Sequence, residues 1–105
     1  MLLERLYSDD DPPPLPVVDD ALARLHDEHP EVRIVAASFV RTHVPAGMTG
    51  AVGALVRALA RTEATLGLLA VEALRRHDTL EAKTALENAR ALPEPVGSRA
   101  RDLLV

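Results

Sequence analysis

HPEVRIVAASFVRTHVP, residues 29–45, has the start and stop features of one complete helix. Pro30 suits a first helical turn, where its missing N–H group has no partner to lose, and Glu31 suits the positive end of the helix dipole. Pro45 ends the pattern because proline cannot continue a helix. The stretch therefore predicts an amphipathic helix. Its apolar residues at helical spacing are Val32, Ala36, Phe39 and Val40.

Helices are also expected on both sides of this stretch. The apolar spacing predicts one helix over residues 17–29, a third capped by Thr49 and a fourth capped by Thr62. A fifth begins at DTLE, residues 78–81, where Asp and Glu have the spacing of a capping box, and ends near Leu92. A short sixth follows at the end of the chain. No window shows the alternation of a half-buried strand, so the chain is predicted to be all-α.

The predicted helices repeat. A shift of 34 residues moves the apolar positions of the first and second helices onto those of the third and fourth. A further shift of 30 residues continues both series. The chain is therefore predicted to form about three antiparallel helical hairpins, each of which completes the core of its neighbour. The inward positions predicted in the third helix are Val52, Leu55, Val56 and Leu59.

The segments PEVRIVAASFV and TEATLGLLAVEALRRH resemble HEAT repeats, whose second helix typically starts with a proline–acid–valine–arginine turn and continues with an alanine-rich stripe. The resemblance covers roughly residues 17–105, although the third unit is shorter. The sequence departs from the family pattern at GMTGAVGAL, where three glycines occupy the entry to the third predicted helix. Each glycine inside a helix destabilises that helix by roughly 1 kcal/mol. The resemblance implies a short right-handed α-solenoid whose second helices line a concave face that holds other macromolecules. It implies no reaction.

Two regions are expected along the chain. Residues 1–16 form an N-terminal apolar segment and a proline-rich lead, and residues 17–105 form the HEAT-like helical repeat domain. The lead DDDPPPLP, residues 9–16, is expected to be non-helical because each proline disfavours helix in the residue before it. Both chain ends are apolar. Either the N-terminal segment caps the first hairpin, or an exposed end pairs with a second copy or another protein.

Composition narrows the functional classes. The absence of cysteine excludes disulfides, thiolate metal ligands and thiol nucleophiles. No apolar run approaches the roughly 18 residues of a membrane span, and the N-terminus lacks the features of a secretory signal, so a cytoplasmic protein is expected. A net charge of −4, a single lysine and only two aromatic residues argue against nucleic-acid binding.

No catalytic or metal-binding residue is predicted, and no cofactor. His26 and His29 stand three residues apart, but a metal site needs a third ligand that the sequence does not indicate. His43 and His77 occupy equivalent repeat positions, which favours helix-terminal cations over a proton-transfer pair. The serines lack a nucleophile-elbow motif, and GMTGAVG lacks the lysine of a phosphate-binding loop.

Arginines of the second helices are the candidate partner-binding residues. With the apolar stripe turned inward, they are expected to point away from the core, and Arg41 and Arg75 should stack close together. Such a row can hold an acidic or amphipathic protein segment through bidentate hydrogen bonds. The alternative is a solvated face whose arginines pair with Glu72 and Asp102. The predicted set is Arg33, Arg41, Arg75, Arg76, Arg99 and Arg101.

The sequence thus favours a non-enzymatic protein–protein interaction module. One alternative is a structural subunit or homodimer that completes a larger assembly through its apolar ends. Another is a small HEAT-like lyase or nucleic-acid-binding protein, since a few HEAT-like families perform such chemistry.

Overall fold

The computed structural model describes residues 15–44, 48, 50–61 and 63–104. This part of the chain contains six α-helices and no strand, which confirms the all-α prediction for the described residues. None of these helices has the length and apolar character needed to cross a membrane. The helices are α2 (Leu15–Arg24), α3 (Pro30–His43), α4 (Ala51–Leu59), α5 (Ala64–His77), α6 (Leu80–Ala89) and α7 (Val96–Leu104).

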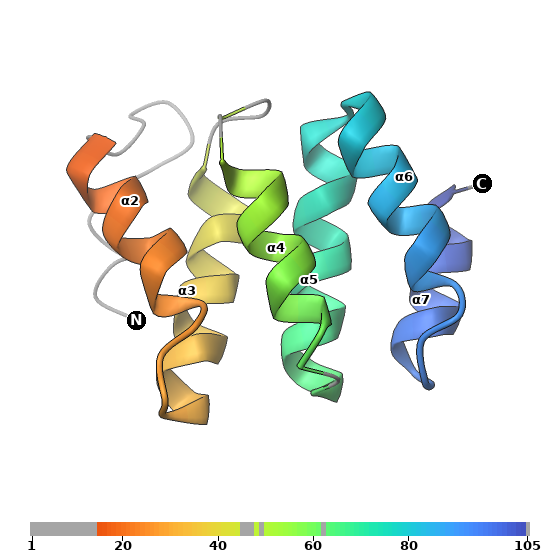
Figure 1. Cartoon of the computed structure of the whole chain (residues 1–105), viewed down its shortest axis with the longest axis horizontal. Helices are drawn as coiled ribbons and strands as arrows, with labels where there is room; N and C mark the ends of the chain where they lie inside the picture. The colour runs from red at the N-terminus through yellow and green to blue at the C-terminus, as the bar shows by residue number, and fades with distance from the viewer. Residues whose placement is uncertain (1–14, 45–47, 49, 62, 105) are drawn as a thin grey trace.

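The helices form two layers (Figure 1). A first layer of α2, α4 and α6 faces the viewer, and a second layer of α3, α5 and α7 lies behind it. Each first-layer helix packs on the next helix in the chain, and neighbours within each layer also touch. Helix α5 contacts α3, α4, α6 and α7. The molecule measures 35 × 28 × 19 Å, and its shortest dimension matches two stacked helices of about 10 Å each.

The two long second-layer helices match the predicted repeat. Helix α3 begins at Pro30 and ends at His43, before the predicted stop at Pro45. Helix α5 also has 14 residues, and its ends lie 34 residues after those of α3. The predicted 34-residue offset therefore holds for the bounds of α3 and α5, whereas α4 begins 36 residues after α2 (51 − 15).

The beginning of α2 corrects the predicted proline-rich lead. Helix α2 starts at Leu15, so Pro16 lies within its first turn, where a helix tolerates proline. The expectation of a non-helical segment 9–16 is therefore wrong for its last two residues. The predicted cap formed by the N-terminal segment lies outside the described residues.

The helix caps also differ from the sequence-based expectation. Thr79, and not Asp78, is the N-cap of α6: its side chain accepts a hydrogen bond from the N–H group of Ala82 at 3.1 Å. Asp78 instead ends α5 in the left-handed region, with φ of 47°, which Asp tolerates better than most residues. Thr49 and Thr62 lie outside the described residues. The N-cap positions of α4 and α5 are held by Gly50 and Glu63.

The core between the layers consists mainly of Leu, Val and Ala side chains, with Phe39 as its largest fully buried member. A small residue allows close approach of α5 and α7. A Cβ on Gly67 of α5 would lie 2.6 Å from Cγ2 of Val96 on α7, so the two helices meet closely there. Among the predicted core residues, Val32 is only partly buried and Val56 on α4 is exposed, at 43%.

Candidate functional site

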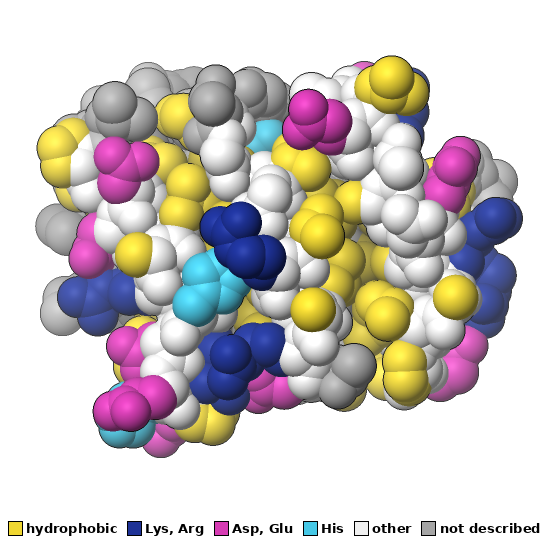
Figure 2. Space-filling model, viewed as in Figure 1, with side chains coloured by type: hydrophobic (Ala, Val, Ile, Leu, Met, Phe, Trp, Pro, Cys, Tyr) yellow, Lys and Arg dark blue, Asp and Glu magenta, His cyan; other side chains and the backbone are white. Residues whose placement is uncertain are grey.

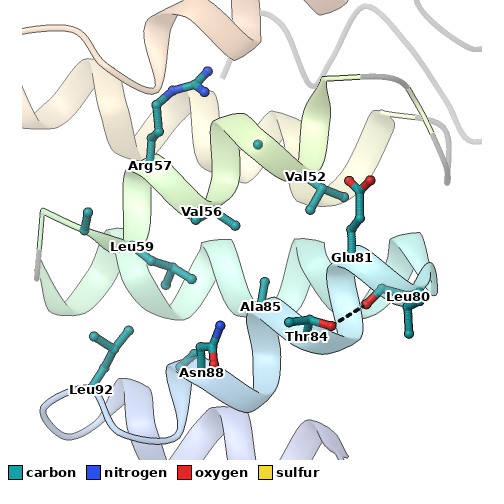
Figure 3. A pocket seen from close by; sticks show the side chains of 13 residues that line it. Val52, Val56, Arg57, Leu59, Leu80, Glu81, Thr84, Ala85, Asn88 and Leu92 are labelled. Atoms are coloured by element: carbon teal, nitrogen blue, oxygen red, sulfur yellow. Dashed lines mark hydrogen bonds between the residues drawn. The ribbon is translucent and has the colours of Figure 1, made fainter.

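A groove of about 750 Å³ lies between α4 and α6 in the first layer (Figure 3). Val52, Val56 and Leu59 reach toward it from α4, and Ala85 lines it from α6. Figure 2 shows the same region as yellow side chains exposed on this face of the molecule. The groove is therefore an accessible apolar surface.

Small side chains explain why the groove is open. Gly53 and Ala60 of the α4 side face Ala85 and Ala89 of α6, and none of these residues reaches across the space. Among the described residues, Val56 and Leu80 are the large apolar side chains that are exposed, at 43% and 81%, and both line this groove. Concentrated apolar exposure of this kind marks binding surfaces more often than scattered single residues do.

Polar groups occupy the rim of the groove. Figure 3 shows Glu81 at the end formed by the first turns of α4 and α6, and Arg57 extending from α4 away from α6. The Thr84 hydroxyl lies 3.0 Å from the carbonyl oxygen of Leu80, to which it donates a hydrogen bond within α6. The lining thus offers apolar contact with charges at its edges. Among the described residues that line the groove, Glu81 is the one acid, so they offer no pair of converging acids for proton transfer.

Two arginines lie near the α4 edge of the groove: Arg57, which lines it, and Arg61, which pairs with Glu63 at 3.1 Å. His26 of the turn after α2 is partly buried, and burial lowers its pKa; the positive charges of Arg57 and Arg61 lower the pKa further. Figure 2 shows dark blue and cyan side chains gathered on this face beside the yellow groove. An acidic group that docks along the α4 edge would meet this positive potential.

Arg33 is not on the surface, in contrast to its predicted place in an exposed row. It is 5% exposed and makes a bidentate ion pair with Glu63, with Nε–Oε1 at 2.9 Å and Nη2–Oε2 at 2.8 Å. Its Nη1 donates to the carbonyl oxygen of Asp27 at 2.6 Å. Hydrogen bonds from Arg33, and then from Arg61, lower the pKa of Glu63. Arg33 therefore joins α3 to the beginning of α5.

Three further arginines of the predicted set join second-layer helices. Glu72 of α5 accepts hydrogen bonds from Arg41 of α3 at 3.1 Å and from Arg99 of α7 at 3.2 Å. Arg76 donates to the carbonyl oxygens of Val40, at 3.4 Å, and of Arg41, at the end of α3. The pairing with Glu72 agrees with the alternative interpretation of a charge-paired face.

The last two arginines differ from each other. Arg101 lies 2.7 Å from Oε1 of Glu94 and donates to the carbonyl oxygen of Arg90 at 3.1 Å. Arg75 is exposed and makes no ion pair with the other described residues, and Asp102 makes none either. Five of the six predicted arginines thus have partners within the chain, and Arg75 alone of the set is exposed without one in the described part.

The histidines have structural surroundings. His77 is buried, and burial followed by the charge of Arg76 lowers its pKa, so it is mainly neutral near pH 7 and not the helix-terminal cation that its position predicted. The ring of His43 packs 5.1 Å from that of Phe39, centroid to centroid. Across the described ranges, no group of three or more His, Cys, Asp or Glu side chains is arranged to hold a metal ion.

The lowered pKa values predict a loss of stability in mild acid. His26 and His77 bind protons more readily in the unfolded chain than in the folded protein, because their pKa values are lower in the folded state. Their contribution to the free energy of unfolding is therefore complete above about pH 6.5 and is lost as the pH falls toward their folded-state pKa values. We expect the urea midpoint of unfolding to fall between about pH 7 and pH 5. His77→Gln should reduce this dependence. A midpoint that is constant or rises on acidification would contradict the prediction.

The sequence pattern does not predict the groove. Val56 lies at an apolar repeat position, which predicts a place in the core, because periodicity shows which side of a helix is apolar but not how closely the next helix approaches. Two features of the sequence are consistent with an open surface: the small residues Gly53, Ala60, Ala85 and Ala89, and the apolar Leu80 at the first position of α6.

Comparisons with protein-family models, with curated proteins and with solved structures gave no match to the chain.

Proposed function

We propose that the protein is a non-enzymatic interaction module with a HEAT-like right-handed α-solenoid architecture, which binds an acidic or amphipathic segment of another protein. The architecture is supported by the two layers of helices and by the 34-residue offset between α3 and α5. Three antiparallel hairpins, α2–α3, α4–α5 and α6–α7, would be its units, since the helices of each pair are in contact.

The apolar groove between α4 and α6 is the observation that carries this function. It combines a volume of about 750 Å³ with exposed Val56 and Leu80 and with charges at its edges. The second-layer face offers less for a partner, because Arg41 and Arg99 are already paired with Glu72. We therefore assign the working surface to the first layer, and the arginine row to a secondary role centred on Arg75.

Self-association is the second candidate. Leu103 and Leu104 at the end of α7 are half-buried against the core, so the exposed large apolar residues of the described chain, Val56 and Leu80, line the groove and not this end. A homodimer formed through the groove is thus favoured over one formed through the end of α7. The cytoplasmic location stays a prediction from the sequence.

The function is tested by affinity capture from the native host with three forms of the protein. Val56→Glu places a charge in the groove, and Arg75→Glu reverses the exposed arginine of the other layer. We expect wild type and Arg75→Glu to recover a common protein that Val56→Glu does not recover. Loss with Arg75→Glu alone would move the site to the second layer. If no form recovers a protein above the tag control, the interaction function is contradicted.

A further inference from the structure

We propose that the groove between α4 and α6 receives an amphipathic helix of a partner protein, with acidic residues along the side that faces α4 and a basic residue at the end that meets Glu81. This proposal rests on the proposed function and specifies its ligand. It concerns the first layer, whereas the HEAT resemblance implied a ligand on the second helices.

The walls of the groove favour a helix over other peptide conformations. An extended peptide that adds to a sheet needs an exposed strand edge, and the described part of the chain has no strand. A proline-rich segment is held by aromatic-lined grooves, and no aromatic residue is among the described residues that line this one. Two helices with a gap between them instead match the helix-in-groove mode, in which a third helix fills the space with its apolar side.

The dimensions of the groove suit about three helical turns. Helix α4 has 9 residues and α6 has 10, so each wall is about 15 Å long at 1.5 Å per residue. The small side chains of Gly53, Ala60, Ala85 and Ala89 permit the close interaxial distance of about 8 Å found at tight helix contacts. Apolar residues of the partner at positions i, i+3, i+4 and i+7 would then lie against Val52, Val56 and Leu59.

Charge selects the partner and its orientation. The α4 edge carries Arg57, and the positive field of Arg57 and Arg61 reaches His26 nearby. Acids on the α4-facing side of the partner helix would meet this field. The carboxylate of Glu81 stands at the opposite end of the groove from Leu59 and Leu92, so a basic residue is favoured there. Edge charges of this kind fix orientation and specificity more than affinity.

The test uses fluorescein-labelled synthetic helical peptides of about 16 residues. The acidic probe has leucines at i, i+3, i+4 and i+7, glutamates along one side of this stripe and a C-terminal lysine. A basic probe replaces each glutamate with lysine, and a scrambled probe keeps the composition of the acidic probe without the stripe. Binding is measured by fluorescence anisotropy with the full chain. We expect the acidic probe to bind at least about tenfold more tightly than the scrambled probe.

Matched variants locate the site. Val56→Glu should lower the affinity for the acidic probe by more than about tenfold. Thr65→Glu, at an exposed position of α5, should leave this affinity unchanged. Arg57→Glu should lower the affinity for the acidic probe by about fivefold and raise the affinity for the basic probe. Arg90→Glu, at the exposed residue that follows α6, should change neither affinity. Circular dichroism confirms that each variant is folded, so that a loss of binding reports on the groove.

The remaining outcomes overturn the proposal. If the acidic and scrambled probes bind equally, or none saturates, no amphipathic helix is recognised. If Val56→Glu and Thr65→Glu behave alike, the probe lies elsewhere. If light scattering shows a dimer of the wild-type chain that Val56→Glu converts to a monomer, a second copy fills the groove. If Val56→Glu abolishes capture of a host protein but no peptide probe binds, the proposed function stands and the helical ligand is contradicted.

Discussion

Phe39→Ala is expected to lower the free energy of unfolding by about 3–5 kcal/mol. Phe39 is fully buried in α3 and is the largest fully buried side chain of the described residues, so its truncation would leave a large cavity in the core. A domain of this size has about 5–15 kcal/mol of stability in total, so the variant should be partly unfolded at moderate temperature. Thermal melting followed by far-UV circular dichroism measures the effect.

The matched control is Val56→Ala, which removes a side chain of the α4–α6 groove that is 43% exposed. Its effect on stability should remain within about 0.5 kcal/mol. If both variants melt at the same temperature as wild type, Phe39 does not stand in the centre of the core, and the packing of α3 against its neighbours is wrong.

Gly97→Ala is expected to destabilise the protein by about 1–3 kcal/mol. A Cβ at this buried position would lie 2.5 Å from the carbonyl oxygen of Leu92 and 3.0 Å from that of Arg90. Both are backbone atoms that a side-chain rotation cannot move, so the segment before α7 must shift. Urea denaturation measures the change in the free energy of unfolding. An unchanged slope of the transition indicates that unfolding remains two-state.

A second glycine provides the control with the opposite sign. A Cβ on Gly53, inside α4, would meet only Nη1 of Arg57 at 3.7 Å, which is an ordinary contact. Since alanine favours a helix interior over glycine by roughly 0.5–1 kcal/mol, Gly53→Ala should stabilise the protein. A shift of the urea midpoint in the same direction for both variants would contradict the close approach at Gly97.

Helix positions in the second layer follow well from the sequence because their signals are local. Pro30 marks the beginning of α3, and the same spacing of apolar residues recurs in α5. The errors occur where two local preferences compete. Asp78 can cap the helix that follows or end the helix that precedes it, and the end of α5 requires a residue that tolerates a left-handed conformation. Thr79 then serves as the N-cap of α6.

The candidate site depended on distances between helices, which the sequence pattern does not contain. The spacing of Arg33 in α3 predicted an outward side chain, but Glu63, thirty residues later, offers a bidentate partner in a buried position. Val56 was predicted to be inside because its own helix has an apolar stripe there. Whether that stripe meets a neighbour depends on how closely α6 approaches α4, and the residue pattern of α4 alone does not contain this distance.

Helix α5 contacts α3, α4, α6 and α7, and among the described helices it lacks contact only with α2. A truncation on either side of α5 would therefore expose apolar surface of α5, the helix against which most of the remaining helices pack. We infer that this chain cannot be divided into independently stable halves, and that it folds in a single cooperative transition.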